Sequence, residues 1–260
     1  MKLFSDYHCH PQAHKLQPYT AELLAPWAAS ARAKGLTDVA VTDHDRYCAG
    51  VDLDAFDAWK EANPDLRLRA GIELDNDPET SAAGRAWVEK NWDRLDFVLG
   101  SVHYLAGKDT MFDSADQAGQ FAERPLEAIY ADYADQVAQM IARGHIDCLS
   151  HLDLVKIHKF RPAGPFLPFF EDLLQRIKKA DLAMEINTAG WRKPVGEQYP
   201  DEAVVRRAVE LGIPLTFSSD AHSHVQLAED YPRLAEIVSR LGVREVALFE
   251  RHRRTMAPLA

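Results

Sequence analysis

The sequence predicts an α/β fold in which parallel β-strands alternate with helices and close into a barrel. Short runs rich in β-branched and aromatic residues recur along the chain, and helix-like segments separate them. This alternation is typical of a parallel sheet, and seven or eight such units favour a barrel. No linker-like change of composition divides the 260 residues, so we expect a single domain over residues 1–260.

The expected strands and helices follow from hydrophobic periodicity and from the residues that end each segment. Strands are expected at 3–7, 38–42, 67–72, 96–102, 146–150, 182–187 and 214–219, with 245–249 as a further candidate. Helices are expected over 21–35, 125–143, 168–180 and 201–212, and the first and last of these close on a glycine. The longer stretches 104–124 and 155–167 are expected to be active-site loops.

Composition excludes several classes of function. The formal net charge of −10 disfavours a broad nucleic-acid surface, although a metal site can still attract a small anionic substrate. No apolar run is long enough to cross a membrane, and the first residues do not resemble a secretion signal. Three cysteines cannot all pair within one chain, which favours a reduced, cytoplasmic protein. The basic run RHRRT near the end is expected to be a solvated tail.

Metal-binding residue types follow the ends of the expected strands in order. They are His8 and His10, Asp43 and His44, Glu73, His103, His151, Glu185 and Asn187, and finally Asp220 and His222. In a parallel barrel the C-terminal ends of all strands meet at one face, where loops build the active site. One such histidine alone is more often a hydrogen-bonded core residue than a ligand, but the convergence of all these ends indicates a metal-dependent hydrolase.

Nine residues are therefore candidate metal ligands: His8, His10, His14, His44, Glu73, His103, His151, Asp220 and His222. His8 and His10 alternate with Cys9, which directs both imidazoles to one side of the strand and the thiol to the other. One four-coordinate ion uses three protein ligands and a water, so nine candidates indicate two or three divalent ions. These ligand types suit zinc, iron or manganese. His145 and His252 lie outside the expected site, and His158 and His224 are in loops near it.

The ordered motifs resemble the polymerase and histidinol phosphatase (PHP) superfamily. They are His8-x-His10, TDHD with His44, GIE with Glu73, GSVH with His103, SHLDLVKIHKF with His151, and SSDAH with Asp220 and His222. The stretches GSVHYL, HLDLVKIHKFRP, EINTAGWRKPVGEQYP and LFERHRRTM are similar to the histidinol-phosphate phosphatases of that superfamily. The resemblance implies a distorted (β/α)7 barrel, TIM-like in outline, that holds a trinuclear metal centre.

The resemblance also implies how the ligands are shared. His8, His10, Glu73 and Asp220 would hold the first ion, and Glu73 would bridge to a second ion bound by His103 and His151. A third ion would be held by His44, His222 and a loop histidine. The nearest loop histidine is His14, four positions after His10, where relatives have a spacing of about six.

The activity that the resemblance implies is hydrolysis of L-histidinol phosphate, with a metal-bridging hydroxide attacking phosphorus in line. The expected catalytic residues are Asp220, His222 and Arg161. Because a guanidinium matches phosphate oxygens two at a time, Arg161 and Arg192 are the expected substrate-binding residues.

Several acids near the expected site are candidates for the cationic end of that substrate, and the sequence does not choose among them. They are Asp45, Asp75, Asp153 and Glu197. Asp43 and Asp153 are alternatively expected to fix the tautomers of neighbouring ligand histidines.

Three alternatives stay open at the level of sequence. The first is a phosphoesterase of the same superfamily that acts on another small phosphate ester or a nucleotide. The second is an exonuclease module, which the acidic, free-standing chain disfavours. The third is a metal-dependent binding or regulatory protein without activity. The expected partner in the preferred interpretation is a small phosphorylated substrate, with no nucleic acid and no membrane.

Overall fold

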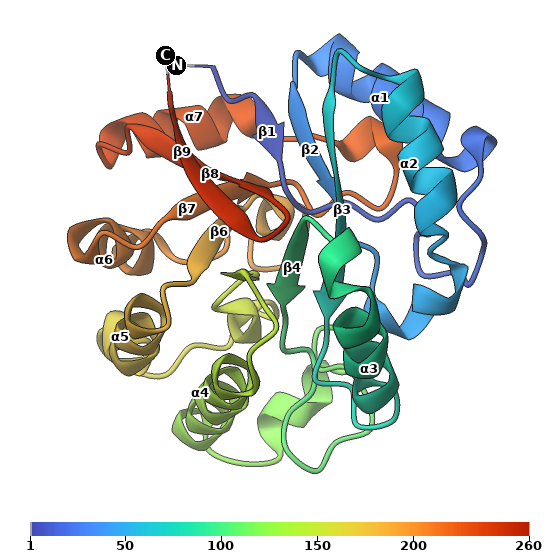
Figure 1. Cartoon of the computed structure of the whole chain (residues 1–260). Helices are drawn as coiled ribbons and strands as arrows, with labels where there is room; N and C mark the ends of the chain where they lie inside the picture. The colour runs from blue at the N-terminus through green and yellow to red at the C-terminus, as the bar shows by residue number, and fades with distance from the viewer. Residues whose placement is uncertain (1, 260) are drawn as a thin grey trace.

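A computed structural model describes residues 2–259 and contains a sheet of seven parallel strands in sequential order (Figure 1). The strands are β1 (Ser5–Asp6), β2 (Asp38–Val41), β3 (Arg67–Leu74), β4 (Phe97–Gly100), β5 (Cys148–Leu149), β6 (Ala183–Asn187) and β7 (Leu215–Ser218). Each expected strand is present, but most are shorter than the pattern predicts. The α/β barrel predicted from the sequence is confirmed.

The two edges of the sheet meet and close the barrel. The amide of Tyr7 donates to the carbonyl of Phe217 at 3.0 Å, and the amide of His10 donates to Ala221 at 2.8 Å. Cys9 and Ala221 form an isolated parallel bridge beyond the regular strands. β1 and β5 are only two residues long. The barrel is therefore distorted, as expected, and its wall is completed by single bridges.

Seven α-helices surround the strands (Figure 1). They are α1 (Ala21–Lys34), α2 (Leu53–Ala62), α3 (Ser81–Asn91), α4 (Leu126–Arg143), α5 (Glu171–Lys179), α6 (Glu202–Leu211) and α7 (Tyr231–Arg240). The four helices expected from the sequence correspond to α1, α4, α5 and α6. Gly35 and Gly212 both adopt left-handed φ angles after the last helical turn, which is the reason that α1 and α6 end where the sequence predicts.

The end of the chain corrects one prediction. The basic run is not a solvated tail, because it turns into β9 (Arg253–Pro258), which pairs antiparallel with β8 (Glu245–Glu250). The ring of His252 lies in the turn, stacked on Trp92 with ring centroids 3.5 Å apart. The backbone amide of Phe249 in β8 donates to the Tyr7 hydroxyl at 2.9 Å. The hairpin therefore covers the N-terminal end of the barrel and leaves the opposite end for the site.

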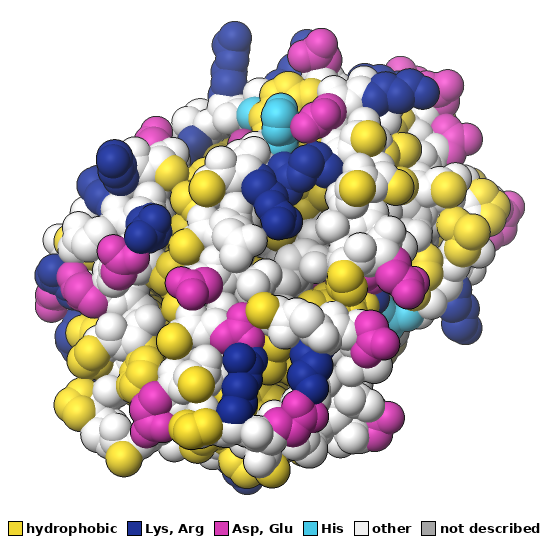
Figure 2. Space-filling model, turned by 90° about the horizontal axis from the view of Figure 1, so that it is seen from below, with side chains coloured by type: hydrophobic (Ala, Val, Ile, Leu, Met, Phe, Trp, Pro, Cys, Tyr) yellow, Lys and Arg dark blue, Asp and Glu magenta, His cyan; other side chains and the backbone are white. Residues whose placement is uncertain are grey.

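The surface carries charges of both signs. Figure 2 shows Lys and Arg side chains interspersed with Asp and Glu on the face seen from below, without a continuous basic field there. Within residues 2–259, no helix is both long enough and apolar enough to span a membrane.

Candidate metal centre

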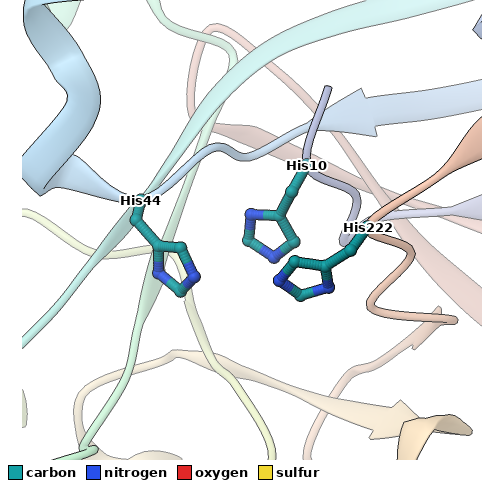
Figure 3. Close-up of side chains that lie close together, drawn as sticks. All are labelled: His10, His44 and His222. Atoms are coloured by element: carbon teal, nitrogen blue, oxygen red, sulfur yellow. The ribbon is translucent and has the colours of Figure 1, made fainter. Parts of the chain in front are cut away.

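The structure gathers eight of the nine predicted ligands at the C-terminal end of the barrel. Their side-chain donor atoms form three sets, each within 4.8 Å, and His10 belongs to two of them. The sets are His10, His44 and His222; His8, His10 and Asp220; and Glu73, His103 and His151. Figure 3 shows the rings of His10, His44 and His222 facing one another, each from a segment that follows a different strand.

Glu73, near the end of β3, lies at the centre of the three sets. Its Oε2 atom is 2.8 Å from His44 Nδ1 and 3.3 Å from His8 Nε2. Its Oε1 atom is 3.4 Å from His151 Nε2 and 3.8 Å from His103 Nε2. One carboxylate thus faces ligands of all three sets, which is the position that a bridging ligand needs.

Asp220 closes the cluster from the segment after β7. Its Oδ1 atom lies 3.3 Å from His10 Nε2 and 3.8 Å from His8 Nε2. The backbone of Asp220 adopts a left-handed φ of 51°, which is uncommon for a residue with a side chain. Such a conformation is found where the surrounding structure requires it, often at functional sites.

The donor set fits divalent metal ions. Buried donor atoms of the cluster have no hydrogen-bond partner, among them both ring nitrogens of His10 and His44, His8 Nε2 and Glu73 Oε2. Buried polar atoms are normally paired, so a group of unpaired ones implies a cation. Two tetrahedral ligands at the usual zinc distances lie about 3.4 Å apart. The separations of 3.3 Å between His8 or His10 and a carboxylate match that spacing.

The ionisation of the cluster suits the same role. Burial by itself raises the pKa of Glu73 and of Asp220, but neighbouring histidines outweigh it and hold both pKa values well below the usual range. Burial lowers the pKa of His10, and it lowers the pKa of His44 by a larger amount. For His222, burial lowers the pKa to about 4. The carboxylates are therefore charged and the imidazoles of His10, His44 and His222 neutral, which is the form in which each binds metals. For His8, burial lowers the pKa, but Glu185, Asp220 and Glu73 together outweigh it and raise the pKa well above its usual value.

Two acids orient ligand histidines from outside the cluster. Glu185 in β6 lies 3.0 Å from His8 Nδ1 and is fully buried. Asp75 lies 2.9 Å from His103 Nδ1. Burial by itself lowers the pKa of His103, but the nearby carboxylates, Asp75 above all, outweigh burial and raise that pKa to about 10. A carboxylate on the second ring nitrogen fixes the tautomer and directs the first nitrogen to the metal. The sequence placed Glu185 at a strand end but did not indicate its partner.

The two acids that the sequence proposed for this task behave differently. Asp43 Oδ1 lies 4.0 Å from His10 Nδ1, and its other oxygen accepts a hydrogen bond from the Tyr19 hydroxyl at 2.7 Å. Asp153 instead forms a fully buried ion pair with Lys156 at 2.9 Å. Asp43 is thus beside a ligand, whereas Asp153 stabilises the loop that follows β5.

His14 lies beside the cluster rather than within it. Its ring centroid is 4.3 Å from that of His222 and 5.0 Å from that of His44, and the residue is exposed. The cluster partly desolvates the ring although the residue is exposed, and this desolvation, together with the nearby His222, lowers the pKa of His14 to about 4. The short loop brings His14 to the set of His10, His44 and His222 but leaves its nitrogens outside the 4.8 Å groups.

A cavity opens above the cluster in two connected parts. The outer part, of about 310 Å³, is lined by His14, His222, Asp220, Arg192 and Lys193 among others. The inner part, of about 60 Å³, reaches Glu73, His103 and His151 and shares His14, Lys193, Asp220 and His222 with the outer part. The two cations Arg192 and Lys193 therefore stand where an anion would enter.

The two arginines predicted to bind substrate differ in position. Arg192 lines the outer cavity, and its Nη2 atom donates to the carbonyl of Ser219 at 2.5 Å. It also lies 3.4 Å from Glu229 and 3.5 Å from Asp230. Arg161 forms ion pairs with Glu197 at 2.5 Å and Asp201 at 3.1 Å, and it does not line either part of the cavity. A role for Arg161 in substrate binding requires its guanidinium to leave these carboxylates.

A parallel barrel with a cluster of histidines and carboxylates for more than one divalent ion, beneath a cavity with cationic walls, is typical of metal-dependent hydrolases. The comparisons with known proteins then define the family. The PHP domain model matches residues 6–189, and the chain belongs to this family.

Curated relatives and solved structures agree with this assignment. A protein of Deinococcus radiodurans named "Probable histidinol-phosphatase" is 36% identical over 194 residues, covering 73% of this chain and 70% of the relative. A histidinol-phosphatase of Lactococcus lactis is 22% identical and covers 94% of this chain and 93% of the relative. The crystal structure of histidinol phosphate phosphatase from Lactococcus lactis, complexed with zinc, L-histidinol and phosphate, has a TM-score of 0.72 at 18% identity. It covers 97% of this chain and 98% of that one, and it shows the same fold.

Proposed function

We propose that the protein is a phosphomonoesterase that hydrolyses L-histidinol phosphate to L-histidinol and phosphate. The observation that carries the proposal is the triple ligand set around Glu73, placed under a cavity whose rim holds Arg192 and Lys193. The 36% identical relative named as a histidinol-phosphatase supports the choice of substrate. A step of histidine biosynthesis would place the protein in the cytoplasm.

The residues of the chain perform three tasks in this proposal. The eight clustered ligands and His14 hold two or three ions, with zinc, iron and manganese as candidates. Such ions, when bound, supply a water of lowered pKa and neutralise phosphoryl oxygens. Asp220 and His222 line the cavity directly and position the ester over the cluster. Arg192 and Lys193 neutralise the phosphate as it enters, since charge-assisted hydrogen bonds to phosphate are strong.

A second candidate is a phosphoesterase of the same family with another small substrate. A protein of Aeromonas hydrophila named "Probable phosphatase" is 23% identical over 93% of this chain, so the fold is shared with proteins that are not named for histidinol phosphate. The clustered ligands serve any phosphate monoester equally. Only the residues around the organic part of the substrate separate the two candidates.

The test is phosphate release from a panel of monoesters, with elemental analysis of the same purified sample. We expect more than one equivalent of divalent metal per chain and a kcat/KM for histidinol phosphate well above that for nucleotides and sugar phosphates. Equal rates for all monoesters would favour the second candidate. A metal-loaded sample inert towards every monoester would instead favour a binding or regulatory protein.

A further inference from the structure

The substrate proposed above carries an ammonium group close to its phosphate, and none of the acids first expected to bind it lines the cavity. Asp75 is buried between Arg46, at 2.7 Å, and His103, at 2.9 Å. Asp45 is buried against Gly84 of α3, where a Cβ atom would lie 2.2 Å from a carboxylate oxygen of Asp45. Neither side chain lines the cavity.

The other two acids belong to the ion pairs of the loop after β5. Asp153 accepts from Lys156 at 2.9 Å and from the backbone amide of Asp201 at 2.7 Å. Glu197 pairs with Arg161 at 2.5 Å. The cavity lining includes neither of them. All four acids are thus unavailable to a cation held above the metal cluster.

Asp113 is a different case, because it lines the inner cavity with the cluster itself. The same lining contains Met111, Leu154 and Ile157, which form an apolar wall, and Tyr199, whose hydroxyl has no hydrogen-bond partner. The Oδ1 atom of Asp113 is buried and has no hydrogen-bond partner. Among residues 2–259, no Lys, Arg or His forms an ion pair with it. A buried carboxylate oxygen without a partner is costly, so its position implies a ligand that donates to it.

The backbone before Asp113 is fixed, which makes this carboxylate a defined part of the site. The side chain of Phe112 is fully buried and packs edge-on against Phe121 and Tyr133. The amide of Phe112 donates to the carbonyl of His103 at 2.9 Å, and its carbonyl accepts from His158 Nε2 at 2.9 Å. The loop is therefore anchored to the segment that carries a metal ligand.

We infer that Asp113 is a specificity-determining residue that receives the ammonium group of an amino-alkyl phosphate, an inference that rests on the proposed function. The phosphate lies over the metal cluster on the side of Lys193, and the carbon next to the ester carbon carries the ammonium towards Asp113. The apolar wall packs against the remaining organic part. The site thereby selects cationic monoesters over neutral ones of the same size.

A matched pair of substrates tests this directly. 2-Aminoethyl phosphate and propyl phosphate have similar size and differ in the ammonium group. We expect the wild-type enzyme to prefer the first in kcat/KM, and we expect Asp113→Asn to lower the ratio of the two values by about 10- to 100-fold. Asp113→Glu keeps the charge and is expected to keep more of the ratio than Asp113→Asn.

Asp116→Asn is the matched control, because Asp116 lies on the same loop, is exposed and does not line the cavity. It removes the same charge and is expected to keep the wild-type ratio. An Asp113→Asn ratio equal to that of the wild type, or a wild-type ratio of one, would overturn the inference. So would an equal fall of the ratio in Asp116→Asn.

A binding measurement makes the result independent of turnover. Calorimetry with L-histidinol and the metal-loaded protein should give a Kd at least tenfold higher for Asp113→Asn than for the wild type. An unchanged Kd would contradict the inference. Failure of the proposed function has a separate signature, namely a wild-type kcat/KM for histidinol phosphate no higher than that for propyl phosphate.

Discussion

At the scale of single residues, one histidine of the site belongs to two ligand sets at once. His10 is fully buried and contributes to the set with Asp220 and to the set with His44. Replacement of its ring removes a donor from two ions together. A water molecule cannot easily take the place of the imidazole ring, because His10 is fully buried.

We therefore expect His10→Ala to lose most of its bound metal and to reduce phosphatase activity by orders of magnitude. Elemental analysis and phosphate release, measured on one preparation, check both effects. His145→Ala is the control, since His145 lies near Glu89 and Trp92, away from the cavity. Full activity in His10→Ala would show that the ligand assignment is wrong.

Glu185 would act on a bound metal through His8 rather than directly. It accepts from the Ser218 hydroxyl at 2.7 Å and from the backbone amide of His151 at 2.6 Å, in addition to its contact with His8. A single carboxylate thus ties three strand ends to one imidazole. Removal of the Glu185 charge should make the His8 imidazole less basic and leave the orientation of the His8 ring less fixed.

For Glu185→Gln we expect a 10- to 100-fold lower metal affinity with the fold retained. Titration of the apoprotein against a chelator of known affinity measures this, and circular dichroism checks the fold. Glu61→Gln, at the exposed end of α2, should bind metal as the wild type does. Equal affinities in the two variants would exclude a positioning role for Glu185.

At the scale of elements, one histidine side chain adds two hydrogen bonds between the β8–β9 hairpin and the barrel. His252 Nδ1 donates to Asp147 at 2.8 Å, and Nε2 donates to the carbonyl of Trp92 at 3.0 Å. Both partners accept, so the ring must be doubly protonated. Burial by itself lowers the pKa of His252, but the hydrogen bond and charge of Asp147, together with the Trp92 carbonyl, outweigh burial and raise the pKa above its usual value.

The hairpin should consequently be stabilised in a pH-dependent way. The contribution of His252 is complete below the pKa of the unfolded state, about 6.5, and is lost as the pH rises through the raised folded pKa. We expect His252→Asn to lower the free energy of unfolding by about 1 kcal/mol or more at pH 6 and by less at pH 9. Urea unfolding at the two pH values measures the difference.

His145→Asn provides the comparison, because its ring also packs edge-on against Trp92, with centroids 5.2 Å apart, but is partly exposed. It should leave the change of stability between pH 6 and pH 9 close to that of the wild type. If His252→Asn lost the same stability at both pH values, the ring would act by packing on Trp92 alone.

The predictions from sequence succeeded where the signal is local and failed where it depends on distant partners. A strand followed directly by His10 or His44 is visible in a short window, and the parallel barrel then implies that such residues converge. The pairing of His8 with Glu185 spans 177 positions, so no local pattern contains it. The basic run looked like a tail because Asp147 and Trp92, which bind His252, lie 105 and 160 positions earlier.

At the scale of the whole molecule, the cluster connects parts of the barrel that the sheet holds weakly. Its ligands come from the ends of six strands, β1 to β5 and β7, while β1 and β5 are only two residues long. Bound ions would link those ends through atoms that otherwise have no partner. Anything that binds only the folded state raises its stability by mass action.

Removal of the metal should therefore lower the Tm of the entire barrel instead of loosening a single loop. At a free metal concentration of 100 times Kd, one site contributes about 2.7 kcal/mol. For a chain of this size, that corresponds to a fall in Tm of about 5 to 10 °C after chelation. Scanning calorimetry with and without chelator measures it, and the double variant with His10→Ala and Asp220→Ala should show almost no further fall. If the chelated wild type kept its Tm, the ions would contribute to chemistry alone, and the short strands would have to be held by the sheet and helices without them.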